Sequence, residues 1–331
     1  MTETIAKYLS VIRRMVSLVI VGIAASCWCA PASAADAKFP TQPIQLIVPY
    51  AAGGGTDTIA RYLQKGMESR LGQPILVINR PGASTTIGTL AVARATPDGH
   101  TLGMVSVPFV TNYSLLKEVP YAPNDLIPVA SVTNAPSVLV VNPSLPIKSV
   151  ADLVSYIKTH PGQVNYATFG IGSGAHLAAL LFESKIGTSL TAVHYRGGAP
   201  AALGVMTGEV QLSFGTPVLM SAGIASGQLR PVAVTASKRL RILPDVPTMR
   251  EQGYDYTNGV WFGVVAPKGT PDAVVQRVHQ VIAEVMAEPA VEKILEDSGS
   301  EVFVKTPREF ADFIASETKQ WAGVLKNVAK Q

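Results

Sequence analysis

The strongest constraint on this chain is a junction at which an apolar strand runs into a glycine-rich turn that opens a helix. Residues 46–57 read Leu-Ile-Val-Pro-Tyr-Ala-Ala-Gly-Gly-Gly-Thr-Asp, and a helical pattern follows over residues 58–70. The first N–H groups of a helix have no partner inside it, and the helix dipole adds partial positive charge there. Since glycine has no side chain, an anion can approach this backbone closely. The junction therefore predicts either a phosphate or carboxylate site or simply a tight turn.

The same junction is repeated along the chain. Strand-like runs precede a glycine turn and a helix at residues 43–49, 74–79, 165–169, 192–196 and 211–214. Two helices, which begin near Thr270 and Thr306, close the chain. Further strands are predicted at residues 101–107, 138–141, 230–235 and 260–267. This alternation predicts an α/β fold with parallel sheets covered by helices on both faces. Because ligands bind beyond the carboxyl ends of such strands, we expect several helix N-termini to converge on one cleft.

The N-terminal segment predicts export. Residues 1–34 combine the basic residues Lys7, Arg13 and Arg14 with an apolar core over residues 15–25 and a small-residue cleavage site that ends at Ala34. The apolar run is shorter than the roughly 20 residues that a membrane span needs. We therefore expect a signal peptide that is cleaved near Ala34 and a soluble exported product.

Composition narrows the classes of function. Both cysteines, Cys27 and Cys29, lie in the export segment, so the rest of the chain has no disulfide, thiolate metal site or cysteine nucleophile. Removing 34 of 331 residues leaves 297, with 24 basic and 22 acidic residues and a net charge of +2. No long basic run occurs, which argues against nucleic acid as a partner. We expect no cofactor and no metal.

The motifs of several enzyme classes are missing. No Walker lysine follows a glycine loop, no G-x-S-x-G elbow occurs, and residues 170–174 have the wrong glycine spacing for a dinucleotide loop. His176 and His194 flank glycine junctions and are candidates for lining the cleft, although a structural role is the alternative. Asp57 is better explained as a helix cap than as a general base. Binding is therefore favoured over catalysis, and we expect no catalytic residue.

Nine motifs, in a fixed order, point to one family. They lie at residues 48–61, 79–83, 97–102, 120–125, 160–166, 172–177, 195–200, 244–253 and 261–271. In this order the chain resembles the Bug family, the periplasmic substrate-binding receptors of tripartite tricarboxylate transporters (TctC-like proteins). The resemblance covers essentially the whole chain after the export segment.

The resemblance implies a two-lobe receptor with a type II periplasmic-binding-protein fold, in which each lobe is a mostly parallel sheet flanked by helices. The first lobe would hold residues 36–136 and 260–331, and the second residues 137–259. The chain would cross between the lobes near residues 134–136 and 258–259. Such a receptor is a periplasmic monomer that closes over a small organic carboxylate and delivers it to the membrane permease.

The resemblance also implies where the ligand binds. Backbone amides and hydroxyls of the first glycine loop would hold one carboxylate end, and loops of the second lobe would face them. Two further loops, at residues 106–111 and 133–135, would shape the wall between. The implied ligand-binding residues are Tyr50, Ala52, Gly53, Gly54, Thr56, Asp57, Ser84, Thr85, Pro108, Ala135, Gly172, Ser173, Gly174, His176, Tyr195, Arg196, Gly197, Thr216 and Pro217.

One departure from the family pattern bears on ligand choice. The family often has two glycines after its Asn-Arg-Pro-Gly-Ala motif, whereas this chain has Ser84, Thr85 and Thr86. Their hydroxyls would either alter ligand choice or cap the following helix. The ligand itself stays open among di- and tricarboxylates, acidic amino acids, nicotinate-like acids and aromatic carboxylates. A receptor that feeds a signalling kinase and, more remotely, a secreted hydrolase are the alternative functions.

Overall fold

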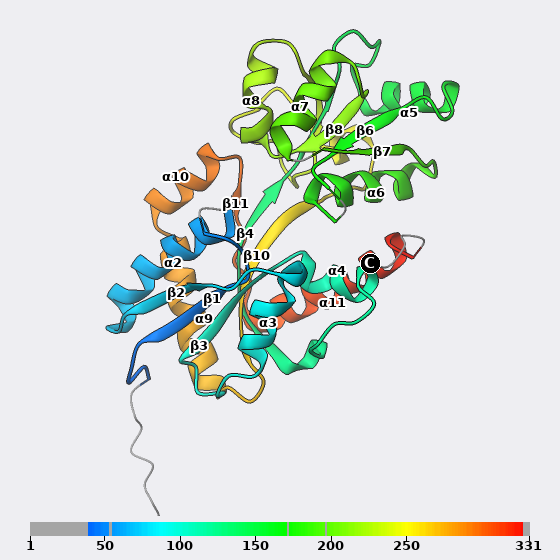
Figure 1. The fold of residues 1–331 in the computed structure, drawn as a ribbon. Helices are drawn as coiled ribbons and strands as arrows, with labels where there is room; N and C mark the ends of the chain where they lie inside the picture. Colours follow the sequence, from blue (N-terminus) through cyan, green and yellow to red (C-terminus); the bar gives the residue numbers. More distant parts are fainter. Residues whose placement is uncertain (1–38, 53–54, 171, 196, 327–331) are drawn as a thin grey trace, which may run out of the picture. The chain divides into compact units, whose positions relative to one another are not determined.

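The computed structural model describes residues 39–52, 55–170, 172–195 and 197–326 (Figure 1). The predicted signal peptide, Gly53, Gly54 and Arg196 lie outside these residues. The described residues from Pro40 onward form one compact unit. In the described residues no helix is both long and apolar enough to cross a membrane.

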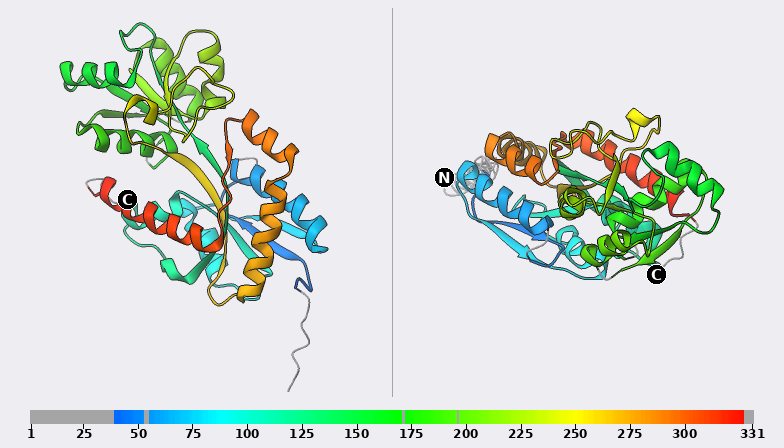
Figure 2. Two further views of the ribbon diagram at one scale, coloured as in Figure 1. Left: turned by 180° about the vertical axis from the view of Figure 1, so that it is seen from behind. Right: turned by 90° about the horizontal axis from the view of Figure 1, so that it is seen from above.

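The first of two sheets has six strands in the order β11-β4-β10-β3-β1-β2. Its strands are β1 (Ile44–Val48), β2 (Ile75–Asn79), β3 (Thr101–Ser106), β4 (Leu126–Pro136), β10 (Gly259–Pro267) and β11 (Glu301–Val302). The helices that pack with it are α2 (Gly55–Leu71), α3 (Thr86–Ala93), α4 (Pro108–Leu115), α9 (Asp272–Met286), α10 (Pro289–Asp297) and α11 (Pro307–Val324). Helices α9 and α11, drawn in orange and red in Figure 2, both contact β4, so the end of the chain completes this sheet's cover.

The second sheet has five strands in the order β7-β6-β8-β5-β9. Its strands are β5 (Val138–Val141), β6 (Asn165–Thr168), β7 (Thr191–His194), β8 (Leu212–Gly215) and β9 (Arg230–Val234). The helices around it are α5 (Val150–Thr159), α6 (Gly174–Ile186), α7 (Gly198–Thr207) and α8 (Pro217–Ala225). Three short turns complete the elements, at η1 (Ala83–Thr85), η2 (Pro123–Asp125) and η3 (Arg250–Gln252). Helices α6, α7 and α8 each follow a strand of this sheet through one of the predicted glycine junctions.

The α/β prediction is confirmed, but the expectation of mostly parallel sheets is wrong because both sheets are mixed. Strand β1 pairs in parallel with β2 and β3, whereas β10 pairs antiparallel with β3 and β4. In the second sheet β6 pairs in parallel with β7 and β8, whereas β5 is antiparallel to β8 and β9. The reason is connectivity: β4 leaves the first sheet and β10 returns to it, so the two strands run in opposite directions.

The C-terminal part also differs from expectation. Three helices close the chain instead of two, because Pro289 opens the separate helix α10 after α9 ends at Met286. A proline at the first helical position removes an N–H that has no helical partner anyway, so it favours a new start. The predicted start of α11 is confirmed: Thr306 and Glu309 form a reciprocal capping box.

Strands β4 and β10, called here the crossing strands, run side by side where the chain passes between the sheets. Gly259 pairs with Pro136, and Val260 pairs with Ala135. Only Ser137 separates β4 from β5. These are the two segments that the resemblance implied for the crossing.

Thr235, just after β9, ties both crossings together. Its hydroxyl accepts the Ser137 N–H at 2.8 Å and donates to the Asn258 carbonyl at 2.5 Å. Its backbone N–H donates to the Ser137 carbonyl, and its carbonyl accepts the Asn258 N–H. Thr235 is only 1% exposed, so water cannot replace these bonds.

We predict that Thr235→Val destabilises the protein by about 1–3 kcal/mol, because it leaves the buried Ser137 N–H and the partly buried Asn258 carbonyl without their side-chain partner. Thr235→Ser keeps the hydroxyl and serves as the matched control. Urea unfolding monitored by circular dichroism measures both variants. Equal midpoints for the two variants would show that the hydroxyl does not matter.

Candidate functional site

The first glycine loop is anchored by a buried carboxylate. Asp57, in the first turn of α2, has a side chain only 3% exposed and accepts hydrogen bonds from Arg61 Nε and Asn79 Nδ2, both at 2.9 Å. Asn79 Nδ2 also donates to the Tyr50 carbonyl at 3.0 Å. Asp57 thus holds the start of α2 against the ends of β1 and β2.

Tyr50 stands at the entrance of this loop and is held by its own sheet. Burial raises the pKa of Tyr50 to about 12, although a hydrogen bond with Ser106 acts in the opposite direction. The phenol is therefore neutral at physiological pH. Ala52 is exposed and Thr56 is buried. Of the described residues of this loop, Ala52 is thus accessible, while Tyr50 and Asp57 are held in place on either side of it.

The turn Ala83–Thr85 leads into α3, which packs against β1. Gly88 in α3 approaches Pro49 so closely that a Cβ added there would lie 2.8 Å from the proline Cβ. Ser84 Oγ donates to Asn112 Oδ1 at 2.9 Å. Thr85 precedes α3 but makes no side-chain cap. Thr86 Oγ1 donates to the Ala83 carbonyl, so it caps no N–H either. The alternative that the hydroxyls of Ser84, Thr85 and Thr86 cap α3 is therefore wrong.

Two stretches expected as wall-shaping loops are regular structure. Pro108 is the first residue of α4, and Ala135 lies inside β4, paired with Val260. Proline's fixed φ suits the first helical position, which explains why residues 108–115 form a helix and not a loop. Residues 133–135 extend β4 because β10 supplies a full antiparallel partner.

The loop before α6 is held by its own side chains. Ser173 Oγ accepts the His176 N–H at 3.3 Å and lies 3.0 Å from Thr168 Oγ1. The Gly172 N–H donates to His176 Nδ1 at 3.1 Å. Burial lowers the pKa of His176 to about 4, and the neighbouring His194 contributes to this shift. A neutral imidazole can accept at Nδ1, so His176 holds the Gly172 N–H within the loop.

This loop reaches the crossing strands and the first sheet's helices. A Cβ added at Gly172 would lie 3.5 Å from Leu115 at the end of α4, and one added at Gly174 would lie 2.8 Å from Val260. Val260 pairs with Ala135, so the structure brings Gly172, Gly174 and Ala135 into one neighbourhood. Glycine at these positions permits the close approach.

The remaining predicted residues lie at other helix starts. Gly197 and Thr216 precede α7 and α8, and neither helix has a side-chain cap. Pro217 lies against Gly299, between α10 and β11, where an added Cβ would be 2.8 Å away. Tyr195 instead lies against Gly204 of α7, within its own sheet's layer. Tyr195 is therefore not brought toward the first sheet by these contacts.

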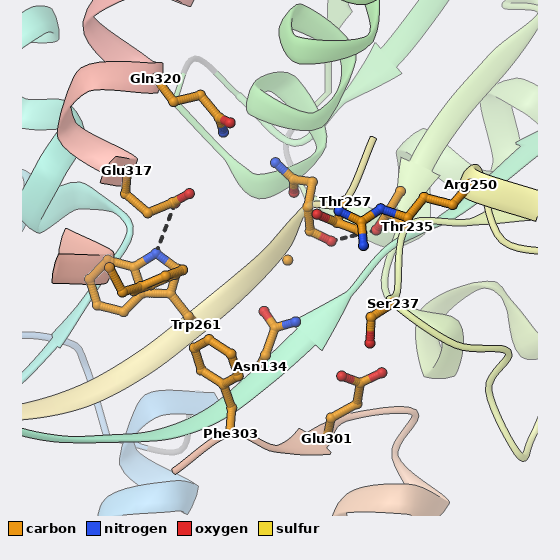
Figure 3. Close-up of a pocket in the computed structure, with 13 residues that line it drawn as sticks. Asn134, Thr235, Ser237, Arg250, Thr257, Trp261, Glu301, Phe303, Glu317 and Gln320 are labelled. Carbon is orange, nitrogen blue, oxygen red and sulfur yellow. Dashed lines mark hydrogen bonds between the residues drawn. The ribbon is translucent and has the colours of Figure 1, made fainter. Parts of the chain in front are cut away.

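A separate pocket occupies the opposite face of the crossing strands (Figure 3). Side chains alternate along a strand, so Asn134 and Trp261 point away from Ala135 and Val260. The pocket has a volume of about 210 Å³ and is lined by residues of β11, α11 and the stretch between β9 and β10. Glu317 Oε2 accepts the indole N–H groups of Trp261 and Trp321, both at 3.1 Å.

None of the residues predicted for the ligand lines this pocket. Burial raises the pKa of Glu317 above its usual range, while the two indole hydrogen bonds act in the opposite direction. The spacing of Glu317 and Trp321, four residues apart on one helix, was the only sequence pattern that could have indicated this pair. In the part of the chain that the structure describes, no group of His, Cys, Asp or Glu could hold a metal ion.

Comparison with known proteins identifies the relatives of this chain. The sequence matches the Tripartite tricarboxylate transporter family receptor over residues 59–329. Protein BugT of Bordetella pertussis is 37% identical over 317 residues, which cover 95% of this chain and 97% of BugT.

Solved structures share the fold. A Rhodopseudomonas palustris protein, solved with adipate, has 32% identity and a TM-score of 0.71, covering 87% of this chain and 97% of its own. MatC from the same species, solved with bound malate, has 31% identity and a TM-score of 0.69. The match covers 87% of this chain and 100% of MatC. The fold is that of periplasmic binding proteins.

We predict that His176→Asn flattens the dependence of stability on pH. Because burial lowers the folded-state pKa to about 4, against an unfolded value of about 6.5, only the unfolded chain takes up this proton as pH falls between them. The parent protein should lose about 1–3 kcal/mol more than the variant over this window, with no difference above pH 7. Urea unfolding of both proteins between pH 4 and pH 7 measures this difference. If the stability of the parent and of the variant changed with pH in parallel, His176 would not be the group that titrates.

Proposed function

Because this chain belongs to the tripartite tricarboxylate transporter receptor family, we propose that it captures a small organic carboxylate in the periplasm and delivers it to a membrane permease of that transporter class. The family is one of receptors and not of enzymes. The adipate and malate in two related structures support a carboxylate as the ligand. The N-terminal segment would direct export, with cleavage near Ala34.

The observation that carries this proposal is the set of helix starts without side-chain caps at the strand ends. Helices α3, α7 and α8 make no side-chain cap, although Thr85 and Thr216 are residue types that often supply one. Their first-turn N–H groups lack intrahelical acceptors. A carboxylate is the natural partner for such groups, since the helix dipole favours negative charge there.

The donors divide between the two sheets. We place one carboxylate end at Ala52, Gly53, Gly54 and Thr56. Because Gly172 and Ser173 already bond within their own loop, the opposing donors would come mainly from Gly174, Gly197 and the start of α8 after Thr216. Hydrogen bonds to a charged group contribute roughly 1.5–3 kcal/mol each. Three or four of them, less ordering costs, are compatible with binding near micromolar, about −8 kcal/mol.

Closure would couple binding to delivery. We propose that residues 36–136 with 260–331 form one lobe and residues 137–259 the other, hinged at the crossing strands. Donors from both lobes can reach one ligand only in the closed form, so the ligand would shift the population toward that form. The permease would then recognise the closed form.

We predict that Ala52→Asp weakens carboxylate binding at least about tenfold without loss of stability. The new charge suits the helix dipole at the start of α2 but repels an anionic ligand there. Ala52→Asn is the neutral control of similar shape. Ala151→Asp is the control for charge. It adds the same negative charge at the start of another helix, α5, which follows β5, and should leave carboxylate binding unchanged.

The measurement is a thermal-shift and calorimetric screen of aliphatic and aromatic carboxylates on the chain from Asp36 onward, refolded to remove any carried-over ligand. At about a hundred times its Kd a true ligand adds roughly 2.7 kcal/mol, a shift of several degrees. Equal affinity in Ala52→Asp and Ala52→Asn would place the ligand elsewhere. Binding of neutral analogues alone would refute a carboxylate receptor.

We also predict a fluorescence change on binding. From Asp36 onward Trp261 and Trp321 are the only tryptophans in the sequence, and both indoles bond to Glu317 beside the crossing strands. Movement at these strands should change the emission with the same midpoint as calorimetric binding. Trp321→Phe should keep the response. Calorimetric binding with unchanged emission would show that closure does not involve the crossing strands.

A further inference from the structure

The turn Ala83–Thr85 is strained. Ala83, Ser84 and Thr85 have φ values of 44°, 50° and 75°, and they are the only non-glycine residues with positive φ in the part of the chain described. In this region an L-residue's Cβ crowds its own backbone, whereas glycine adopts the conformation without penalty. Three such residues in succession persist only where the surroundings hold them.

Asn112 supplies much of that hold. It lies on α4 and has no exposed surface. Its Nδ2 donates to the Ser84 carbonyl at 2.7 Å, and its Oδ1 accepts from Ser84 Oγ at 2.9 Å. From α3, Thr86 Oγ1 donates to the Ala83 carbonyl at 2.8 Å and Thr89 Oγ1 to the Thr85 carbonyl at 3.0 Å. All three carbonyls of the turn are thus fixed by side chains.

The position of the turn gives this strain a use. The turn follows β2 at the carboxyl edge of the first sheet and leads into the uncapped start of α3, whose Gly88 lies against Pro49, the residue after β1. Ser84 is exposed, so the turn presents a side chain at that edge as well as backbone. Glycine would remove both the strain and the side chain.

We propose that the Ala83–Thr85 turn is a specificity-determining element, in which strain is retained so that the exposed Ser84 shortens one end of the ligand cleft. Asn112 is its positioning residue. The inference rests on the proposed function and adds to it a substrate class: short aliphatic dicarboxylates in preference to long ones. If glycine stood at position 84, a hydrogen atom would take the place of the side chain and leave room for a longer ligand.

The test replaces the strained residues with glycine, singly and together, as Ser84→Gly, Thr85→Gly and the double variant. Thr85→Gly should raise the melting temperature by about 2 °C, because it removes left-handed strain. Ser84→Gly should raise it less, because it also removes the hydrogen bond from Ser84 Oγ to the buried Asn112 Oδ1. Dissociation constants are then measured for the straight-chain series from malonate to suberate. The ratio of affinities should shift at least about fivefold toward the longer acids in the double variant.

Ser155→Gly is the matched control for the chemical change. Ser155 is an exposed residue inside α5, where glycine lowers helix stability. Its melting temperature should fall by about 2 °C, and its affinity ratio should equal that of the parent protein.

Asn112→Ala tests the positioning role without touching the turn. It should lower the melting temperature and shift the affinity ratio in the same direction as the glycine variants. Its effect on stability should be smaller in the Ser84→Gly background, because a relaxed turn needs less restraint. Equal effects in both backgrounds would remove Asn112 from this role.

Two results would overturn the inference. One is a melting temperature that falls in both single glycine variants, since the turn would then not be strained. The other is a melting temperature that rises while the affinity ratio stays within about twofold of the parent, since the strain would then be unrelated to ligand choice. If the parent binds no carboxylate at all, the proposed function fails and the selectivity claim with it, while the melting temperatures still decide the strain.

Discussion

The hydrogen bonds of Thr235 are the constraint on which the rest of the structure depends. One buried hydroxyl joins Ser137 and Asn258, the residues at which the chain leaves the first sheet and returns to it. The two passages are thus held at one point, next to the end at which β4 and β10 pair antiparallel.

Sequence reasoning succeeded where a local pattern determines the structure. The alternation of strands and helices and the helix start at Thr306 are set by neighbouring residues, and both are present in the described residues. It failed where distant partners decide. Residues 126–136 form a long strand only because β10 lies beside them, and Pro289 divides a helical stretch that reads as continuous.

The candidate site shows the same division. The positions of the glycines beside the strand ends were predictable. Which hydrogen-bond partner each of their backbone N–H groups takes was not. Whether Gly172 faces a ligand or a neighbour depends on His176, four residues on, and on the burial that keeps its imidazole neutral. Asn112 was not predicted, because its partner Ser84 lies 28 residues away in the sequence. Glu317 was not predicted either, since Trp261 is 56 residues away.

Stability and binding make opposite demands at the carboxyl edges of the two sheets. At α6 the donors are partly used by Ser173 and His176, which fixes the loop and leaves fewer groups for a ligand. At α7 and α8 no side chain caps the helix, so donors remain but the helix start is less stable. The distribution of side-chain caps therefore distinguishes α6, whose loop is fixed by its own side chains, from α7 and α8, whose first turns have no side-chain cap.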